Sequence, residues 1–166
     1  MGQQITGSLA AFNQLYKEMD EIYHQYAKQH SLSDTALWLL YSLYESGAAP
    51  TQSALCSAWH YPPQTLNSTL KGLERQGMIA LKAVPGNRKN KYIKPTEKGR
   101  EALQQMIAPL VCAERETFQA LAPQERETLL ALTRKYISLL QAQIQATSGT
   151  PLDPPAKSTA AGAQES

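Results

Sequence analysis

The sequence is poor in cysteine and contains no long apolar run. The chain has 166 residues and only two cysteines, Cys56 and Cys112, too few for the disulfide scaffold of a small secreted domain. No apolar run approaches the ~18 residues that a membrane span needs, which excludes an integral membrane protein. Residues 1–6 lack the basic and apolar regions of a secretory signal. These absences predict a protein of the reducing cytoplasm without a membrane partner.

Motifs of enzymes and metal sites are also missing. We find no phosphate-binding glycine loop, no nucleophile elbow and no His-Glu-x-x-His helix. The three histidines and two cysteines form no cluster of about four ligands at short spacing. We therefore expect no enzyme, no metal and no cofactor. The two thiols are expected to be buried and inert, with oxidant sensing as the alternative, for which Arg115 beside Cys112 is the one supporting feature.

Positive charge is concentrated in one segment. Residues 61–100 hold nine basic and two acidic residues, a net charge of +7, whereas the remainder holds seven basic and twelve acidic residues, a net charge of −5. A basic segment in an otherwise acidic chain is typical of a surface that faces a polyanion such as nucleic acid. A solvated charged face with no partner is the alternative interpretation.

Apolar residues at three- and four-residue steps, together with capping residues, predict that most of the chain is helical. Ser33, Thr51 and Thr96 are the expected N-caps, and Pro62 or Pro63 opens one helix. Pro109 lies inside a helical pattern and should kink or split it. The expected helices cover residues 8–30, 33–46, 52–58, 63–76, 97–121 and 123–146.

A change of period follows the fourth expected helix. Residues 78–84 and 91–94 are β-prone, and the turn-forming residues 85–90 between them predict a hairpin with a basic, flexible tip. A short helix, a tight turn at residues 60–61, a second helix and a stop at Gly77 are typical of a helix-turn-helix, and the hairpin makes it a winged one. The predicted fold class is mainly α with a small β-hairpin wing.

Three segments resemble the MarR family of bacterial transcription regulators. They are residues 73–79 (Leu-Glu-Arg-Gln-Gly-Met-Ile), residues 96–99 (Thr-Glu-Lys-Gly) and the presumed wing tip at residues 86–89 (Gly-Asn-Arg-Lys). Residues 64–68 (Gln-Thr-Leu-Asn-Ser) resemble the branch with a Gln-Thr-x-Asn-Ser recognition helix. Asn87 stands where the family usually has an aspartate. The resemblance covers residues 8–146 and implies a homodimer that binds double-stranded DNA.

Candidate DNA-binding residues follow from the helix period and the hairpin. With Leu66, Leu70 and Leu73 facing the core, the opposite side of the fourth helix faces the major groove, where amide side chains read base edges. The candidates on this helix are Pro63, Gln64, Thr65, Asn67, Ser68 and Lys71. The wing candidates are Asn87, Arg88, Lys89 and Lys91, with Arg88 in the minor groove. Thr51 and Gln52, at a helix N-terminus, are candidate phosphate contacts, although Thr51 also serves as a plain N-cap.

Excess apolar surface on the flanking helices predicts dimerisation through residues 8–30 and 97–146. The expected organisation is a flexible N-terminus (1–7), a winged-helix domain (8–146) with its DNA-binding lobe at residues 33–100, and a disordered tail (147–166). By resemblance, the chain is a regulator, more often a repressor, that binds a pseudo-palindromic operator. The alternative is a winged-helix module that binds proteins and not DNA.

Aromatic side chains in the first two helices are the candidate effector site. In the family, small aromatic ligands often bind between the dimer helices and the DNA-binding lobe. The resemblance thus makes Tyr16, Tyr23, Trp38 and Tyr41 candidate pocket residues, with ordinary core packing as the alternative.

Overall fold

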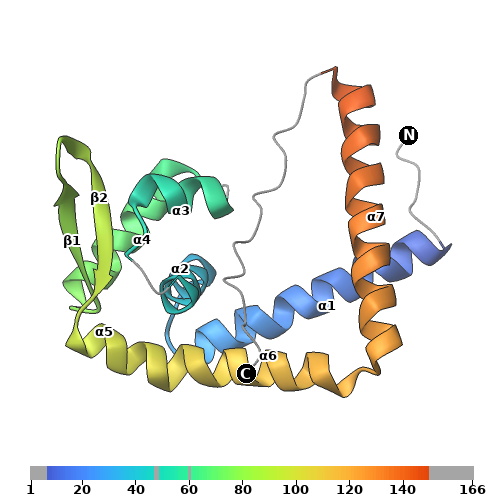
Figure 1. The fold of residues 1–166 in the computed structure, drawn as a ribbon, viewed down its shortest axis with the longest axis horizontal. Helices are drawn as coiled ribbons and strands as arrows, with labels where there is room; N and C mark the ends of the chain where they lie inside the picture. The colour runs from blue at the N-terminus through green and yellow to red at the C-terminus, as the bar shows by residue number, and fades with distance from the viewer. Residues whose placement is uncertain (1–6, 47–48, 60, 150–166) are drawn as a thin grey trace. The chain divides into compact units, whose positions relative to one another are not determined.

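The computed structural model describes residues 7–46, 49–59 and 61–149, without the side chains of Arg88 and Lys89. These residues form two compact units that divide between Ala108 and Pro109. The N-terminal unit contains α1 to α5, both strands and a π-helical turn (Figure 1). Residues 1–6 and 150–166, which include most of the expected flexible termini, lie outside the described part of the chain, as do Gly47 and His60.

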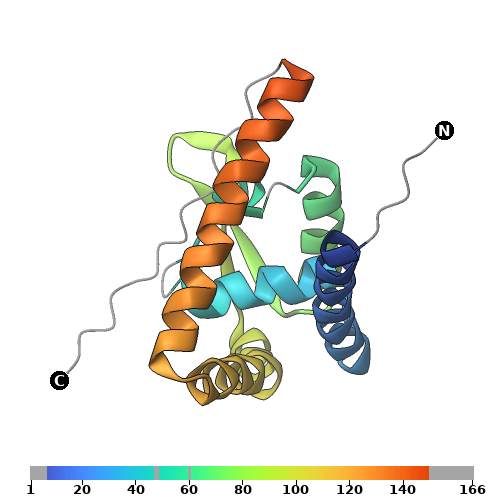
Figure 2. The ribbon, with the colours of Figure 1, turned by 90° about the vertical axis from the view of Figure 1, so that its right-hand side faces the viewer.

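α2 (Asp34–Glu45) is the central helix of the first unit. Ser33 caps it, accepting a hydrogen bond from the Ala36 amide at 3.2 Å. Leu37, Leu39 and Leu40 are at most 1% exposed, and α2 packs against α1 (Gly7–Gln29), α4 (Pro63–Arg75) and the π-helical turn. Figures 1 and 2 show α2 meeting the C-terminal half of α1. The expected N-cap and central position are confirmed.

The hairpin has a shorter tip than the sequence predicts. β1 (Ile79–Val84) pairs antiparallel with β2 (Asn87–Pro95), and Leu81 lies opposite Ile93. Only Pro85 and Gly86 separate the strands, and Gly86 has a φ of +76°, which a glycine adopts without strain. The expected loop at residues 85–90 was too long, because a register shift between Ala83 and Val84 lets residues 87–90 join the strand despite their turn-forming composition.

The fifth expected helix is continuous through Pro109. Thr96 caps α5 (Glu97–Ala102), a π-helical turn follows (Leu103–Ile107), and α6 (Ala108–Ala120) continues from it. The Ala108 amide donates to the Leu103 carbonyl, five residues back. A proline lacks the amide of the normal α-helical bond and crowds the carbonyl four residues earlier. A π-helical turn thus interrupts the α-helix directly before Pro109.

The second unit contains α6 beyond Pro109 and α7 (Pro123–Ser148). Pro123 opens α7 as predicted, and the Glu125 carboxylate accepts a hydrogen bond from the Ala122 amide at 2.7 Å. α7 ends at Gly149, whose φ of +64° is left-handed. No residue of α7 is buried within this chain.

Candidate nucleic-acid interface

α4 has one buried apolar face and one exposed polar face. Leu66, Leu70 and Leu73 are 1–2% exposed and pack where α4 meets α2 and β1. The opposite face is exposed at every position that the sequence assigned to DNA reading: Pro63, Gln64, Thr65, Asn67, Ser68 and Lys71. The leucine spacing of three to four residues rotates these side chains away from the core. All six predicted residues of α4 are therefore exposed.

α3 (Gln52–Trp59) begins beside both the hairpin and α4. Thr51 caps it, as predicted, since the Thr51 hydroxyl accepts from the Ala54 amide at 3.2 Å. The Ser53 amide donates to the Asn90 side-chain oxygen at 3.3 Å. Two of the first-turn amides thus already have acceptors inside the protein. A phosphate at this helix end would instead meet the side chains of Thr51 and Gln52.

The wing carries exposed cations next to a polar turn. The side chain of Lys91 is exposed, as is that of Lys94. The Asn87 side-chain oxygen accepts from the Asn90 amide at 3.2 Å, so Asn87 folds the chain locally at the position of the family's aspartate. The side chains of Arg88 and Lys89 lie outside the described residues, although their backbone belongs to β2.

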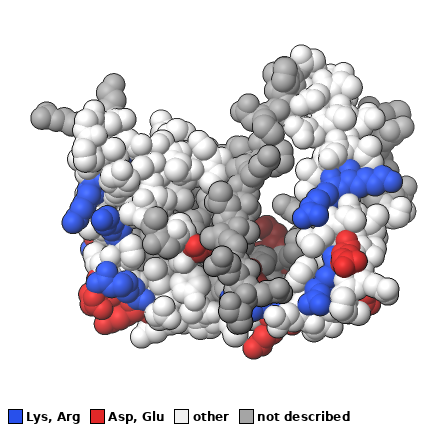
Figure 3. All heavy atoms as spheres, viewed as in Figure 1, with Lys and Arg blue, Asp and Glu red and all other residues white. Residues whose placement is uncertain are grey.

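The described lysines on the exposed faces of α4 and β2 form no ion pair with a described acidic side chain. Among the described side chains, no ion pair involves Lys71, Lys91 or Lys94; Arg100 pairs with Glu97 on α5. Figure 3 shows Lys and Arg side chains on the side where Figure 1 draws the hairpin. Unpaired exposed cations beside a polar helix face give a positive potential that attracts phosphate.

Tyr61 connects the start of α4 to the start of α2. Its phenol is hydrogen-bonded to Thr35 and lies near the carboxylate of Asp34. Burial raises the pKa of Tyr61 above its ordinary value, the bond with Thr35 lowers it, and the charge of Asp34 raises it. Asp34 in turn contacts His24 of α1 at 3.0 Å. Polar contacts thus join α1, α2 and the N-terminal end of α4.

The structure brings together three of the four candidate effector residues. The ring centroids of Tyr23 and Trp38 are 4.8 Å apart, and those of Trp38 and Tyr41 are 5.6 Å apart. Tyr16 is 63% exposed and makes no ring contact with another described residue. Trp59, at the end of α3, stacks on Trp38 at 5.2 Å.

Trp59 was missed because it lies outside the two helices in which the aromatic residues concentrate. Its indole nitrogen donates to the Ser42 hydroxyl at 2.5 Å, and that hydroxyl donates to the Trp38 carbonyl at 2.9 Å. The sequence offered one sign of its role, because Trp59 lies directly before the turn that leads into α4. The aromatic cluster of Tyr23, Trp38, Tyr41 and Trp59 joins α1, α2 and α3.

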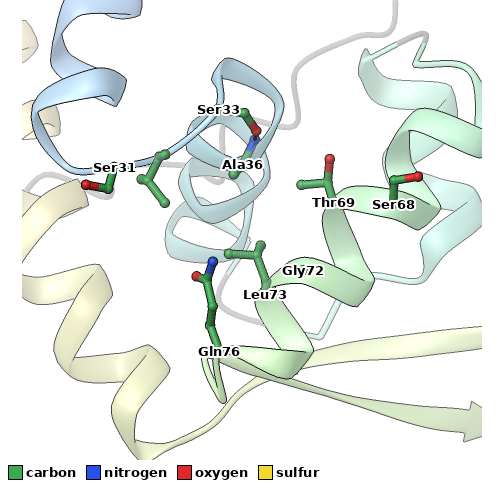
Figure 4. A pocket seen from close by; sticks show the side chains of 9 residues that line it. Ser31, Ser33, Ala36, Ser68, Thr69, Gly72, Leu73 and Gln76 are labelled. Carbon is green, nitrogen blue, oxygen red and sulfur yellow. Dashed lines mark hydrogen bonds between the residues drawn. The ribbon is translucent and has the colours of Figure 1, made fainter.

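A shallow pocket of about 300 Å³ lies elsewhere, between the α1–α2 connection and the inner side of α4 (Figure 4). Hydroxyls of Ser31, Ser33, Ser68 and Thr69 line it, together with the amide of Gln76. None of the four candidate effector residues lines this pocket.

Cys112 contradicts the expectation of two buried thiols. Its side chain is exposed, and that of Cys56 is half-buried. The Cys112 thiol donates to the Glu116 carboxylate at 3.5 Å. Within the described ranges, no three His, Cys, Asp or Glu side chains converge on a potential metal site, and no helix is long and apolar enough to cross a membrane.

Comparison with known proteins gives the same family that the motifs indicated. A model of the MarR family matches residues 30–89, the segment that contains α2, α3, α4 and β1. The comparison with curated proteins found no match. The resemblance of this chain to the MarR family is confirmed by the family model and by the solved structures that share its fold.

Three solved structures illustrate the similarity. NMB1585, a MarR family regulator from Neisseria meningitidis, has a TM-score of 0.71 at 18% identity, covering 86% of this chain and 99% of that one. MepR of S. aureus in complex with DNA has a TM-score of 0.67 at 22% identity, covering 82% and 100%. BpsR of Bordetella bronchiseptica, whose DNA binding is regulated by 6-hydroxynicotinic acid, has a TM-score of 0.62 at 18% identity, covering 81% and 97%. The winged-helix fold predicted from the sequence is therefore confirmed.

Proposed function

We propose that this MarR-like winged-helix protein is a sequence-specific transcription regulator that binds double-stranded DNA as a homodimer. The observation that carries the proposal is the exposed polar face of α4, backed by three buried leucines and placed beside a basic hairpin. The MarR-family match over residues 30–89 supports DNA-binding transcription regulation in general.

The proposed contact residues fall into groups according to the part of the DNA that they contact. Gln64, Thr65, Asn67 and Ser68 read base edges in the major groove, because an α-helix fits that groove and amides pair with bases. Lys71 and Lys91 contact phosphates, which position the protein without specifying sequence. Arg88 enters the minor groove, where narrow A·T-rich segments attract cations, and Lys89 contacts a flanking phosphate. Thr51 and Gln52 contact the backbone beside α3.

The second copy of the chain covers the exposed apolar residues of α1 and α7. Leu15 and Ile22 on α1 are each 65% exposed, and Leu132 and Leu139 on α7 are 60% and 56% exposed. An apolar surface of this extent is unusual on a monomer. A symmetric dimer would bury the apolar residues of each helix on both copies. Two recognition helices then meet a pseudo-palindromic operator with half-sites roughly 10 bp apart.

Repression follows when such an operator overlaps a promoter, and a small aromatic ligand relieves it. The aromatic cluster supports this part of the proposal, because its rings join α1, the dimerisation helix, to α2 and α3. A ligand that binds only one arrangement of these helices shifts the population towards that arrangement. The regulation of BpsR by 6-hydroxynicotinic acid is a precedent for such an effector.

Fluorescence anisotropy tests the proposal. We would titrate the protein into duplexes from the intergenic region upstream of its own gene and into scrambled duplexes, across a salt series. Specific DNA binding predicts a preference of ~10³ or more and a steep loss of affinity with salt. Lys71→Gln should reduce the slope of log affinity against log salt by about one. Lys28→Gln, at an exposed position on α1, is the matched control and should leave the slope unchanged.

The opposite outcome would favour the protein-interaction module. That module predicts no binding to either duplex at low salt, even after bound ligand has been removed by denaturation and refolding. Salt-dependent binding without preference would keep DNA as the partner and place the operator elsewhere.

A further inference from the structure

We propose that the first turn of α3 is a brace that positions both DNA-reading elements, with Ser53 holding the wing and Gln52 holding the recognition helix. The inference rests on the proposed function, because it assigns positioning roles within the same DNA-binding surface. It assigns Gln52 a role inside the protein, in addition to any contact with phosphate.

The wing arm of the brace is a pair of hydrogen bonds between Ser53 and Asn90. The Asn90 side-chain nitrogen donates to the Ser53 hydroxyl at 2.8 Å, and the Ser53 amide donates to the Asn90 side-chain oxygen at 3.3 Å. The side-chain amide of Asn90 thus supplies one donor and one acceptor to Ser53. Such a two-point contact fixes both the distance and the orientation of the side chain.

Backbone contacts between residues 50–51 and β2 hold the base of the wing. The Ile93 amide donates to the Pro50 carbonyl at 2.9 Å, and Thr51 forms a bridge with Tyr92. Asn90 continues this contact towards the hairpin turn and lies two residues from Arg88 along β2. The Ser53–Asn90 contact therefore restrains the part of the wing that carries the predicted minor-groove arginine.

The recognition-helix arm is the bond from Gln52 to Asn67. The Gln52 side-chain nitrogen donates to the Asn67 side-chain oxygen. Asn67 is exposed on the face of α4 that reads bases. The bond selects a rotamer of Asn67 before DNA arrives, so that less side-chain entropy is lost on binding. It also leaves the side-chain nitrogen of Asn67 to donate to acceptors on base edges.

The two arms predict different defects. Loss of the wing arm frees the tip and weakens binding to all sequences that carry the half-site. Loss of the recognition-helix arm lets Asn67 rotate and relaxes the preference at the base pair that it contacts. A residue that served only the stability of α3 would produce neither pattern.

The test of the wing arm is a set of anisotropy titrations with Asn90→Ala, Ser53→Ala and the double variant. Each single change should weaken operator binding about three- to tenfold, and the double variant should be no weaker than the worse single one. In an Arg88→Ala background, Asn90→Ala should have no further effect. Ser57→Ala, at an exposed position later in α3, is the matched control and should bind as the unchanged protein does.

Hydrogen exchange tests the brace without DNA. Amides of residues 87–91 should exchange faster in Asn90→Ala and Ser53→Ala than in the unchanged protein, while the melting temperature stays the same. For the recognition-helix arm, Gln52→Ala should lose preference at a single base pair per half-site in a set of singly substituted operators.

The wing arm would be overturned if the losses of operator affinity in Asn90→Ala and Ser53→Ala added up in the double variant. It would also be overturned if Asn90→Ala weakened binding as much in the Arg88→Ala background as in the unchanged protein. Unchanged base preference in Gln52→Ala would overturn the recognition-helix arm. If the unchanged protein binds no DNA, the proposed function fails, whereas the exchange experiment still decides whether Ser53 holds the wing.

Discussion

Gly99 is a position where one added methyl group should destabilise the winged helix. A Cβ atom built at Gly99 would lie 1.8 Å from the carbonyl oxygen of Met78 and 2.9 Å from its carbonyl carbon. Both neighbours are backbone atoms, so no side-chain rotation relieves the clash. The Met78 carbonyl must therefore move by more than 1 Å to reach the 3.0 Å below which real Cβ contacts essentially never occur.

That movement breaks the junction between α4, β1 and α5. The Thr96 amide donates to the Met78 carbonyl at 3.0 Å, and the Thr96 hydroxyl donates to the Gly77 carbonyl at 2.5 Å. Overpacking costs about 1–3 kcal/mol, and a lost backbone hydrogen bond costs about 1 kcal/mol. We expect Gly99→Ala to lower the free energy of unfolding by about 3 kcal/mol. For a protein of this size, the melting temperature falls by about 6–12 °C.

Gly72→Ala is the matched control. Gly72 lies inside α4, and a Cβ there would meet no atom within 4 Å. Replacing a helical glycine by alanine stabilises by about 0.5–1 kcal/mol, because the unfolded chain loses conformational freedom. Circular dichroism melts at one protein concentration should therefore shift in opposite directions for the two variants. A Gly99→Ala protein that melts within 2 °C of the unchanged protein would refute the reasoning.

Three further predictions follow from burial and exposure. Leu70→Ala removes a side chain that is 1% exposed and should cost about 2–5 kcal/mol in urea unfolding, whereas a cost below 1 kcal/mol would contradict its core position. Leu15→Glu should convert the proposed dimer into a folded monomer in sedimentation, with its circular dichroism spectrum unchanged; a persistent dimer would exclude α1 from the interface. Burial raises the pKa of Tyr61 above its ordinary value, so above about pH 10 the unfolded chain releases the phenolic proton more readily than the folded chain. Stability should fall there as pH rises, and less steeply in Tyr61→Phe; equal slopes would contradict the burial of this phenol.

Local sequence signals predicted the structure correctly where a feature depends on residues close together in the chain. The caps at Ser33 and Thr96 and the leucine face of α4 were predicted because each depends on residues within a few positions. The exposed polar face of α4 followed directly from that leucine spacing.

Features that depend on distant residues were not predictable in the same way. The polar residues 87–90 are typical of a loop, yet they join β2, and the Asn90 side chain meets Ser53, 37 positions away. The stacking of Trp59 on Trp38 likewise depends on how α3 packs against α2. Residue-by-residue propensity contains no information about such tertiary contacts.

The π-helical turn before Pro109 is a place where the helix can gain or lose one residue. A π turn holds more residues than the 3.6 of an α-helical turn, so it accommodates about one extra residue without rotating the segments on either side. Deleting one residue within 103–107 and replacing Pro109 by alanine should leave an ordinary α-helix with both flanking segments still in phase. The same deletion in the regular part of α6 would turn every later side chain by about 100°. Relatives of this chain whose lengths differ by one residue are thus expected to differ at this turn.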